Sequence, residues 1–198
     1  MFSGRGTGRM GRIRKLRFSG KPAKWFLTFG FKLLYFACLT DRRKFILSDR
    51  DDVVTIYTDG GCDPNPGVGG WGAILIYGGS YKELSGGELC STNNRMEMTA
   101  AIKALEALKR KCKAIIYTDS EYLQKGITQW LPGWKRRNWR RKGGEIKNLD
   151  LWRRLDELAQ AHDVEWRWVR GHTGNIHNER CDSLAGEEIG KLRARCNT

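Results

Sequence analysis

One tetrapeptide occurs twice in this sequence, as Ile56-Tyr57-Thr58-Asp59 and as Ile116-Tyr117-Thr118-Asp119, and its two copies decide the fold. Each copy closes a short run rich in β-branched and aromatic residues, which predicts a β-strand. If the two strands are parallel neighbours, about 4.8 Å apart, Asp59 and Asp119 stand side by side at the carboxyl edge of one sheet, where open α/β sheets bind their ligands. Adjacent carboxylates repel each other unless a cation or a shared proton lies between them.

The sequence around these two runs predicts an α/β fold. Strands are expected at 53–58, 70–77, 81–89, 114–118 and 164–169, with a hairpin turn at Gly78-Gly79. Helices are expected at 93–109, from the capping residue Ser120 to about Trp130, at 149–160 and at 178–193, with a break at Pro132-Gly133 and a short basic helix after it. This order implies a mixed sheet, in which the first three strands pair antiparallel and the later ones return in parallel through helical crossovers.

Two further acidic residues point to the same sheet edge. Glu97 lies four residues before Ala101, and Asp182 lies three before Ala185, so each sits on the flank of a helix face that should meet the sheet. A carboxylate at such a position is costly unless it has a partner. Four converging carboxylates with no Cys or His cluster describe an all-oxygen site, which suits Mg²⁺ or Mn²⁺ rather than zinc. Two such ions can activate a water and stabilise the leaving oxygen of a phosphodiester.

Five motifs resemble, in order and spacing, the signature of bacterial type 1 ribonuclease H over about residues 52–195. They are Asp59-Gly60, Thr92-Asn93-Asn94-Arg95-Met96-Glu97, Thr118-Asp119-Ser120, Gly171-His172 and Asn178-Glu179-Arg180-Cys181-Asp182. The resemblance implies a mixed five-stranded sheet flanked by helices, with a basic protrusion. It also implies an endoribonuclease that hydrolyses the RNA strand of RNA–DNA hybrids and leaves 5′-phosphate and 3′-hydroxyl ends.

The same resemblance assigns the catalytic residues. The metal ligands would be four carboxylates, Asp59, Glu97, Asp119 and Asp182. They would hold two Mg²⁺ ions when substrate is bound, and Mn²⁺ could substitute. His172 would be a mobile residue that assists proton transfer or product release. Its setting agrees with that role, because Gly171 and Gly174 flank it and give a loop that can move.

Substrate contacts are implied at the minor groove of the hybrid, where the 2′-hydroxyl distinguishes RNA from DNA. By resemblance, these contacts come from Gly60, Cys62, Asn65, Asn93 and Asn94, with Thr92 and Asn178 near a phosphate. The sequence departs from the family's pattern at Gly61, where serine is common, and at Glu121, where glutamine is common. A carboxylate at Glu121 would repel a nearby phosphate, which puts that contact in doubt but not catalysis.

A tryptophan-rich basic stretch, residues 130–142, reads WLPGWKRRNWRRK and places six basic residues in the eight positions 135–142. It is similar to the basic protrusion of the longer bacterial family members, which grips the DNA strand. Charge supplies affinity through counterion release, and indoles can stack on bases or pack on sugars. The substrate contacts implied here are Trp130, Trp134, Lys135, Arg136, Arg137 and Trp139. The alternative is a solvated basic face whose tryptophans hold two helices together.

The positive charge of the chain is concentrated at its start. The formal net charge is +14, and residues 1–50 hold 13 Lys or Arg against two Asp, a net of +11, which leaves +3 for residues 51–198. We therefore expect a basic leader at 1–50 and a ribonuclease H catalytic domain at 51–198. The leader is interpreted as disordered or as an over-extended start, and its apolar run 25–40 leaves a membrane or transit function open.

The six cysteines are scattered with no C-x-x-C spacing, which favours reduced thiols in a cytoplasmic protein. The expected partner is an RNA–DNA hybrid duplex, and the expected protein is a monomer with no stable protein partner. Two other hypotheses stay open. A junction resolvase or integrase-like nuclease would be expected to lack the Asn93-Asn94 and Gly171-His172 elements, and a non-catalytic hybrid-binding module would be favoured by a missing acid.

Overall fold

The structure is a computed structural model that describes residues 53–196 of the chain. The predictions for the basic leader at 1–50 and for its apolar run 25–40 lie outside the described residues. Within residues 53–196, no helix has both the length and the apolar character needed to cross a membrane.

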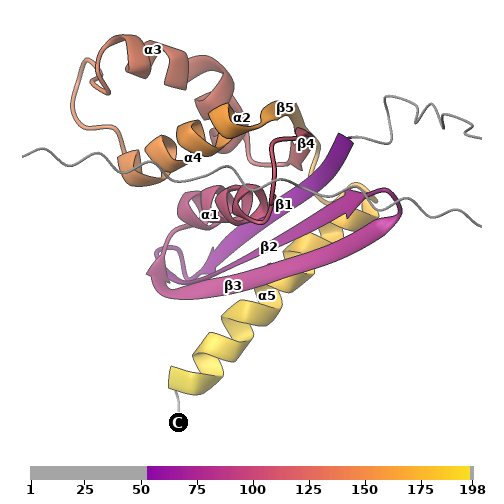
Figure 1. Cartoon of the computed structure of the whole chain (residues 1–198). Helices are drawn as coiled ribbons and strands as arrows, with labels where there is room; N and C mark the ends of the chain where they lie inside the picture. The colour runs from indigo at the N-terminus through magenta and orange to yellow at the C-terminus, as the bar shows by residue number, and fades with distance from the viewer. Residues whose placement is uncertain (1–52, 197–198) are drawn as a thin grey trace, which may run out of the picture. The chain divides into compact units, whose positions relative to one another are not determined.

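Five strands form one mixed sheet, in the order β3-β2-β1-β4-β5 (Figure 1). The strands are β1 (Val53–Asp63), β2 (Gly67–Tyr77), β3 (Ser80–Ser91), β4 (Lys113–Thr118) and β5 (Asp163–Trp168). β2 pairs antiparallel with β1 and with β3, whereas β4 pairs parallel with β1 and with β5. The predicted mixed sheet is confirmed. The predicted hairpin turn is also confirmed, because Gly78 and Gly79 join β2 to β3 with φ values of 52° and 79°, which favour glycine.

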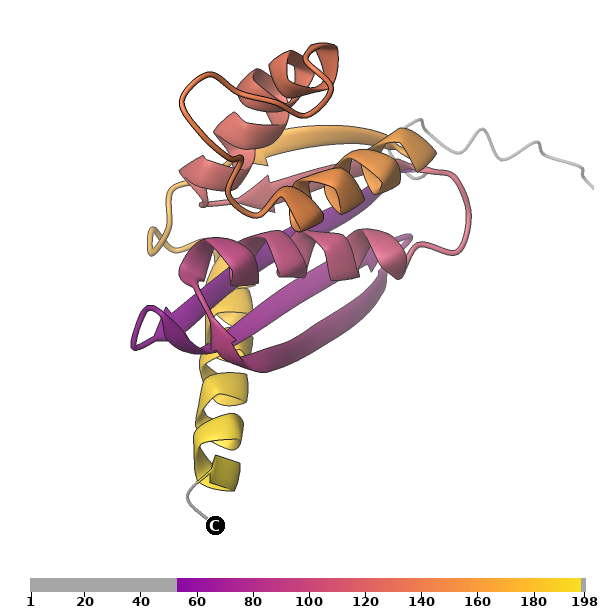
Figure 2. The ribbon, with the colours of Figure 1, turned by 90° about the vertical axis from the view of Figure 1, so that its left-hand side faces the viewer.

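Helices cover both faces of this sheet (Figure 2). α1 (Asn93–Glu106) and α4 (Leu149–Ala161) lie over one face, and α5 (Ile176–Cys196) lies over the other. They correspond to the predicted helices 93–109, 149–160 and 178–193, and no end differs by more than three residues. The larger hydrophobic core lies between the sheet and the helices α1 and α4, and it includes Ile56, Leu105 and Ile116. A smaller core of Ile74, Cys181 and Leu184 lies under α5.

α5 approaches β2 closely because two glycines of the strand face the helix. A Cβ on Gly70 would lie 2.1 Å from the carbonyl oxygen of Ala185, and a Cβ on Gly72 would lie 2.4 Å from that of Cys181. Both distances are far inside van der Waals contact, so a larger residue would push the helix away from the sheet. This close packing fixes where the first turns of α5 lie relative to the strands.

The tryptophan-rich stretch continues a helical run. α2 (Glu121–Lys125) passes through a π-helical segment (Gly126–Trp130) into α3 (Leu131–Arg136), which extends beyond the sheet in Figure 1. The predicted break at Pro132-Gly133 is therefore wrong. Pro132 occupies the first turn of α3, where its fixed φ is compatible with a helix. The helix ends after Arg136, and the chain turns through Asn138 and Trp139, which both have positive φ.

Candidate active site

Asp59 and Asp119 are brought together by the register of two parallel strands. β1 and β4 pair in register up to Thr58 opposite Thr118, so the two copies of the tetrapeptide lie side by side. β4 ends at Thr118 as predicted, but β1 runs on to Asp63 because it remains paired with β2. The expectation that both aspartates directly follow a strand is therefore wrong for Asp59, which lies inside β1.

The same register stacks two tyrosine rings that the sequence reasoning missed. The ring centroids of Tyr57 and Tyr117 lie 4.9 Å apart, with 14° between the ring planes. The hydroxyl of Tyr117 accepts a hydrogen bond from Arg167 of β5 (2.9 Å). Side chains alternate along a strand, so Tyr57 lies on the same side of the sheet as Asp59. The repeated tetrapeptide is the signal that could have revealed this stack.

Glu97 reaches this edge because Gly60 lets α1 pack directly on β1. A Cβ on Gly60 would lie 2.4 Å from the backbone carbonyl carbon of Met96, so a larger residue would separate the helix from the strand. The backbone N–H of Gly60 donates a hydrogen bond to Asp59 Oδ1 (2.7 Å). From the side of α2, the hydroxyl of Ser120 donates to Glu97 Oε2. The Glu97 carboxylate is thus held between β1 and the start of α2.

Asp119 is held by residues from β5, from α5 and from the loop between them. Asn178 of α5 donates a hydrogen bond from Nδ2 to Asp119 Oδ2 (3.1 Å). The indole N–H of Trp168 donates to the backbone carbonyl oxygen of Asp119 (3.0 Å). Gly171 packs so closely that a Cβ there would lie 2.6 Å from Asp119 Oδ2. The position of this carboxylate therefore depends on the last strand and the last helix of the fold.

Burial and mutual repulsion raise the pKa of two of the four predicted carboxylates. Burial is the largest cause for Asp59, and together with the charges of Asp119, Asp182 and Glu97 it raises the pKa of Asp59 to about 8. Burial and the charge of Asp119 raise the pKa of Glu97 to about 7, although the hydrogen bond from Ser120 acts in the opposite direction. Asp182 is exposed on α5. The four carboxylates thus form one electrostatic cluster.

The chemistry of this cluster fits a hard divalent cation. Its donors are carboxylate oxygens, which Mg²⁺ and Mn²⁺ prefer. A cation among them would also relieve the repulsion that raises the pKa of Asp59. Within residues 53–196, however, no three Asp, Glu, His or Cys side chains are arranged so that they could hold a metal ion as they stand.

His172 lies in the loop between β5 and α5, directly after Gly171. Its side chain is exposed, and its φ of 51° lies in the left-handed region, as does that of Gly174 at 85°. Left-handed backbone is uncommon for a residue other than glycine and here marks a tight turn. The predicted loop is present, and the role of His172 in proton transfer or product release stays a prediction.

The residues predicted to contact the minor groove gather where the turn between β1 and β2 meets the start of α1. Asn65 Oδ1 accepts a hydrogen bond from the backbone N–H of Asn93 (3.3 Å). Cys62 Sγ lies 3.3 Å from a backbone carbonyl oxygen at the end of β3. Thr92 caps α1 with its hydroxyl oxygen, and Asn94 is exposed in the first turn of that helix. The structure thus joins Asn65 to Asn93, and the contacts of all these residues with substrate stay predictions.

Two polar residues are tied to neighbouring side chains. Asn178 is only 2% exposed and its amide is bonded to Asp119, and its predicted place near a phosphate stays a prediction. Glu121 forms an ion pair with Lys125 one turn along α2 (2.6 Å). This pairing offsets part of the negative charge that was expected to repel a phosphate.

The tryptophans of residues 130–142 differ in exposure. Trp134 is 8% exposed, and its ring packs edge-on against that of Trp152 in α4, with centroids 5.6 Å apart. This packing favours the alternative interpretation, in which Trp134 holds α3 to α4, and its contact with substrate stays a prediction. Trp139 is partly buried beneath the guanidinium of Arg153, which lies 5.7 Å from the ring centroid. Trp130, at 37% exposure, presents the most surface of the three.

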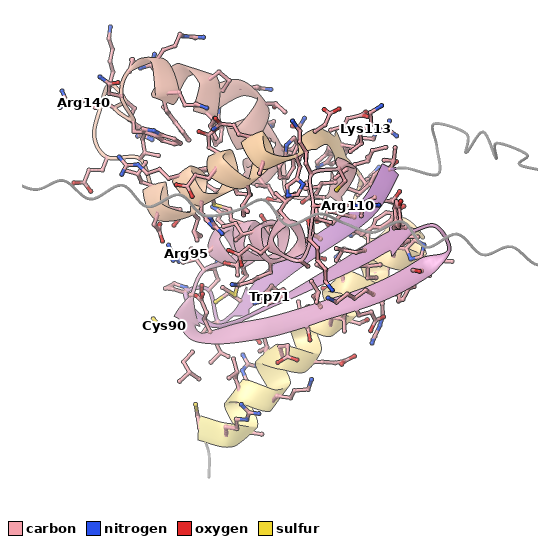
Figure 3. The ribbon with its side chains drawn as sticks, viewed as in Figure 1. Trp71, Cys90, Arg95, Arg110, Lys113 and Arg140 are labelled. Carbon is pink, nitrogen blue, oxygen red and sulfur yellow. The ribbon has the colours of Figure 1, made fainter. Side chains whose placement is uncertain are left out.

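Most of the cations of this stretch face solvent. Lys135 is paired with Asp156 of α4 (2.7 Å), and Arg140 is labelled at the outer end of this region in Figure 3. All six basic side chains of the stretch are exposed, and the five besides Lys135 are Arg136, Arg137, Arg140, Arg141 and Lys142. We call these five residues the basic protrusion.

Two cavities lie near basic residues, one at each end of the fold. A cavity of about 310 Å³ at the base of the basic protrusion is lined by Tyr122, Trp130, Trp134, Arg141, Ile146 and Lys147. A larger one, of about 790 Å³, lies at the amino ends of β1 and β4, near Arg110 and Lys113 in Figure 3. No predicted site residue lines the larger cavity, so size alone does not identify the functional site.

A mixed sheet with this strand order, carrying a carboxylate cluster from two strands and two helices at one edge, defines a ribonuclease H-like protein. The family model for RNase H matches residues 51–190. A "Ribonuclease H" from Thiobacillus denitrificans is 59% identical over 145 residues, which cover 73% of this chain and 97% of that protein. A "Ribonuclease H" from Methylobacillus flagellatus is 57% identical over 145 residues, covering 73% of this chain and 96% of that protein.

Solved structures agree with this assignment. LC9-RNase H1, described as a type 1 RNase H with the type 2 active-site motif, is 34% identical with a TM-score of 0.64, and the match covers 71% of this chain and 73% of that one. RNase H1 from the halophilic archaeon Halobacterium salinarum is 28% identical with a TM-score of 0.54, over 70% of this chain and 98% of that one. This chain belongs to the ribonuclease H family, and the resemblance drawn from its motifs is confirmed.

Proposed function

We propose that this protein is an endoribonuclease that hydrolyses the RNA strand of RNA–DNA hybrids and leaves 5′-phosphate and 3′-hydroxyl ends. One observation carries the proposal: the Asp59 carboxylate is buried where the charges of Asp119, Asp182 and Glu97 act on it. This arrangement occurs in a chain that is 59% identical over 145 residues to a protein named "Ribonuclease H".

The four carboxylates would hold two Mg²⁺ ions when substrate is bound, and Mn²⁺ could replace them. When bound, these ions would supply the Lewis acidity that activates a water and neutralises charge on the leaving oxygen. The chain itself orients the carboxylates, through the Gly60 N–H at Asp59 and the Asn178 amide at Asp119. His172, from its exposed loop, would carry a proton on a ring nitrogen or assist release of product.

Two surfaces would bind the two strands of the hybrid. Near the start of α1, the RNA strand and its 2′-hydroxyl groups would meet Gly60, Cys62, Asn65, Thr92, Asn93 and Asn94. The basic protrusion, with Trp130, Trp139 and Lys135 beside it, would hold the DNA strand mainly through charge. We further propose that residues 51–198 form the catalytic domain of a cytoplasmic monomer, and that residues 1–50 lie outside that domain.

One assay tests the activity. The purified protein is given end-labelled RNA–DNA hybrid, double-stranded RNA, double-stranded DNA and single-stranded RNA, each with Mg²⁺ and with a chelator. Only the RNA strand of the hybrid should be cut, only with the metal, and the products should be ligatable at a 5′-phosphate. Cutting of double-stranded DNA would favour a resolvase or integrase-like enzyme, and binding without cleavage would favour a non-catalytic module.

A further inference from the structure

A buried serine next to the carboxylate cluster makes two hydrogen bonds through one oxygen. Ser120 follows Asp119 in the chain and is 5% exposed. Its Oγ accepts a hydrogen bond from the backbone N–H of Leu123 (3.2 Å) and so caps α2. Its own backbone N–H donates to Thr118 Oγ1 (3.2 Å). A hydroxyl has a single hydrogen to donate, and in this structure the acceptor of that hydrogen is Glu97 Oε2.

The helix cap holds the oxygen of Ser120 in place independently of Glu97. Because Oγ is tied to the first turn of α2 and the backbone of Ser120 is tied to Thr118, the oxygen cannot move away from this position without breaking the cap. A lone pair of the oxygen accepts the hydrogen bond from Leu123 of the helix, whereas the O–H donates to the Glu97 carboxylate. The two tasks are therefore chemically separate, although one atom performs both.

Glu97 needs an external anchor for two reasons. A glutamate side chain has three rotatable bonds and samples several rotamers unless a contact selects one. In addition, the negative charge of Asp119 acts on the Glu97 carboxylate and repels it. The donor hydrogen of Ser120 carries a partial positive charge, so it opposes this repulsion where the two carboxylates approach. It also links α1 to a residue 23 positions later in the chain.

We propose that Ser120 is a positioning residue that holds the Glu97 carboxylate beside Asp119, so that both can serve the same bound cation. This inference rests on the proposed function. It assigns to Ser120 a task beyond capping α2.

Two substitutions test this task while costing the helix cap little. Ser120→Thr keeps the hydroxyl and the cap, whereas Ser120→Gly removes the hydroxyl at a position where glycine is well tolerated. Thr128→Ala is the matched control, because Thr128 Oγ1 donates to a backbone carbonyl in the same helical run (2.6 Å) and does not touch Glu97. Mg²⁺ and Mn²⁺ binding to the full-length protein is measured by calorimetry without substrate, and kcat and KM are measured on hybrid over a range of Mg²⁺ concentrations.

Ser120→Gly should weaken metal binding, and should lower kcat at limiting Mg²⁺, by about 10–100-fold, the usual effect of losing a group that orients a metal ligand. KM for hybrid should stay unchanged, because Ser120 is buried. Ser120→Thr should restore both metal binding and kcat, and Thr128→Ala should leave both unchanged.

Three results would overturn the proposal. They are unchanged metal affinity in Ser120→Gly, an equal loss in Ser120→Thr, and a loss that merely follows the unfolded fraction measured by circular dichroism at the assay temperature. Failure of the proposed function is distinguishable from these results. If the wild-type protein binds Mg²⁺ but does not cut hybrid, the function is wrong, while the calorimetric series still tests Ser120.

Discussion

Asn178 and Asp119 are joined by a hydrogen bond between residues 59 positions apart, from the amide Nδ2 to the carboxylate Oδ2 at 3.1 Å. Asn178 is 2% exposed, and its Oδ1 is buried without a hydrogen-bond partner within the described structure. The last helix thus sets the orientation of an aspartate at the end of β4.

Asn178→Ala should lower kcat by about 10–100-fold, because it removes the group that orients a predicted metal ligand. It should also cost up to about 1.5–3 kcal/mol of stability, the usual range for a hydrogen bond to a charged group. Asn178→Asp should be more damaging, because it places a second carboxylate against Asp119. Steady-state kinetics and urea unfolding check both effects. Wild-type kcat in Asn178→Ala would show that Asp119 does not depend on this amide.

Asp59→Asn should abolish cleavage and leave hybrid binding nearly intact. The carboxylate is expected to hold metal, whereas affinity is expected to come from the basic protrusion and from the polar residues near the start of α1. Turnover in Mg²⁺ is compared with binding of labelled hybrid in chelator. Substantial residual turnover would remove Asp59 from the centre of the mechanism.

Without metal, the carboxylate cluster should make the protein less stable as the pH rises. In the folded protein the pKa values of Asp59 (about 8) and Glu97 (about 7) exceed their ordinary values of 3.8 and 4.5. The folded state therefore binds more protons than the unfolded state across this window, and its stability falls with rising pH. This contribution is complete below about pH 4 and is lost as the pH passes through 7 and 8.

Thermal melting in chelator from acid to mildly alkaline pH measures this effect. Other carboxylates, such as Glu83 and Asp150, have lowered pKa values and act in the opposite direction. The informative quantity is therefore the difference in melting temperature between the wild type and Asp59→Asn. As the pH rises, the variant should become increasingly more stable than the wild type. Added Mg²⁺ should stabilise the wild type at high pH by binding the folded state. A difference in melting temperature that does not change with pH would contradict the raised pKa of Asp59.

Replacing Arg136, Arg137, Arg140 and Arg141 together by Gln should raise KM for hybrid and flatten its salt dependence. Each lost phosphate contact should reduce the slope of log affinity against log salt by about 0.7–0.9. The matched control removes four charges at the other end of the sheet, by changing Lys109, Arg110, Lys111 and Lys113 to Gln. If both variants raise KM equally, net charge rather than the basic protrusion accounts for the effect.

Trp134→Ala should destabilise the protein by about 3–5 kcal/mol, the cost of removing a large aromatic side chain from a packed core. Trp134 is 8% exposed, whereas Trp130 is 37% exposed, so Trp130→Ala should cost much less. Urea unfolding of the two variants gives the comparison. Equal losses of stability would show that Trp134 is not the residue that joins α3 to α4.

The sequence alone was sufficient for the number of strands, the hairpin turn and the alignment of the two tetrapeptides, although not for the end of β1. The two copies of the tetrapeptide predicted two neighbouring strands, and the structure pairs them in register at Thr58 and Thr118. Glycines at positions 78 and 79 predicted the turn that joins β2 to β3. These features follow from local rules, namely β-propensity, the alternation of side chains along a strand and the positive φ that glycine allows.

Only the tertiary structure decided which polar groups support the site and which aromatic residues are buried. The sequence gives no sign that Asn178 turns inward to Asp119, that the hydroxyl of Ser120 reaches Glu97, or that Trp134 is part of the core. It also misled at Pro132, where a helical run continues through a π-helical segment. Each of these outcomes depends on how helices pack against the sheet and on each other. Spacing along the chain does not determine that packing, because the partners lie 18 to 59 residues apart and meet only once the core has formed.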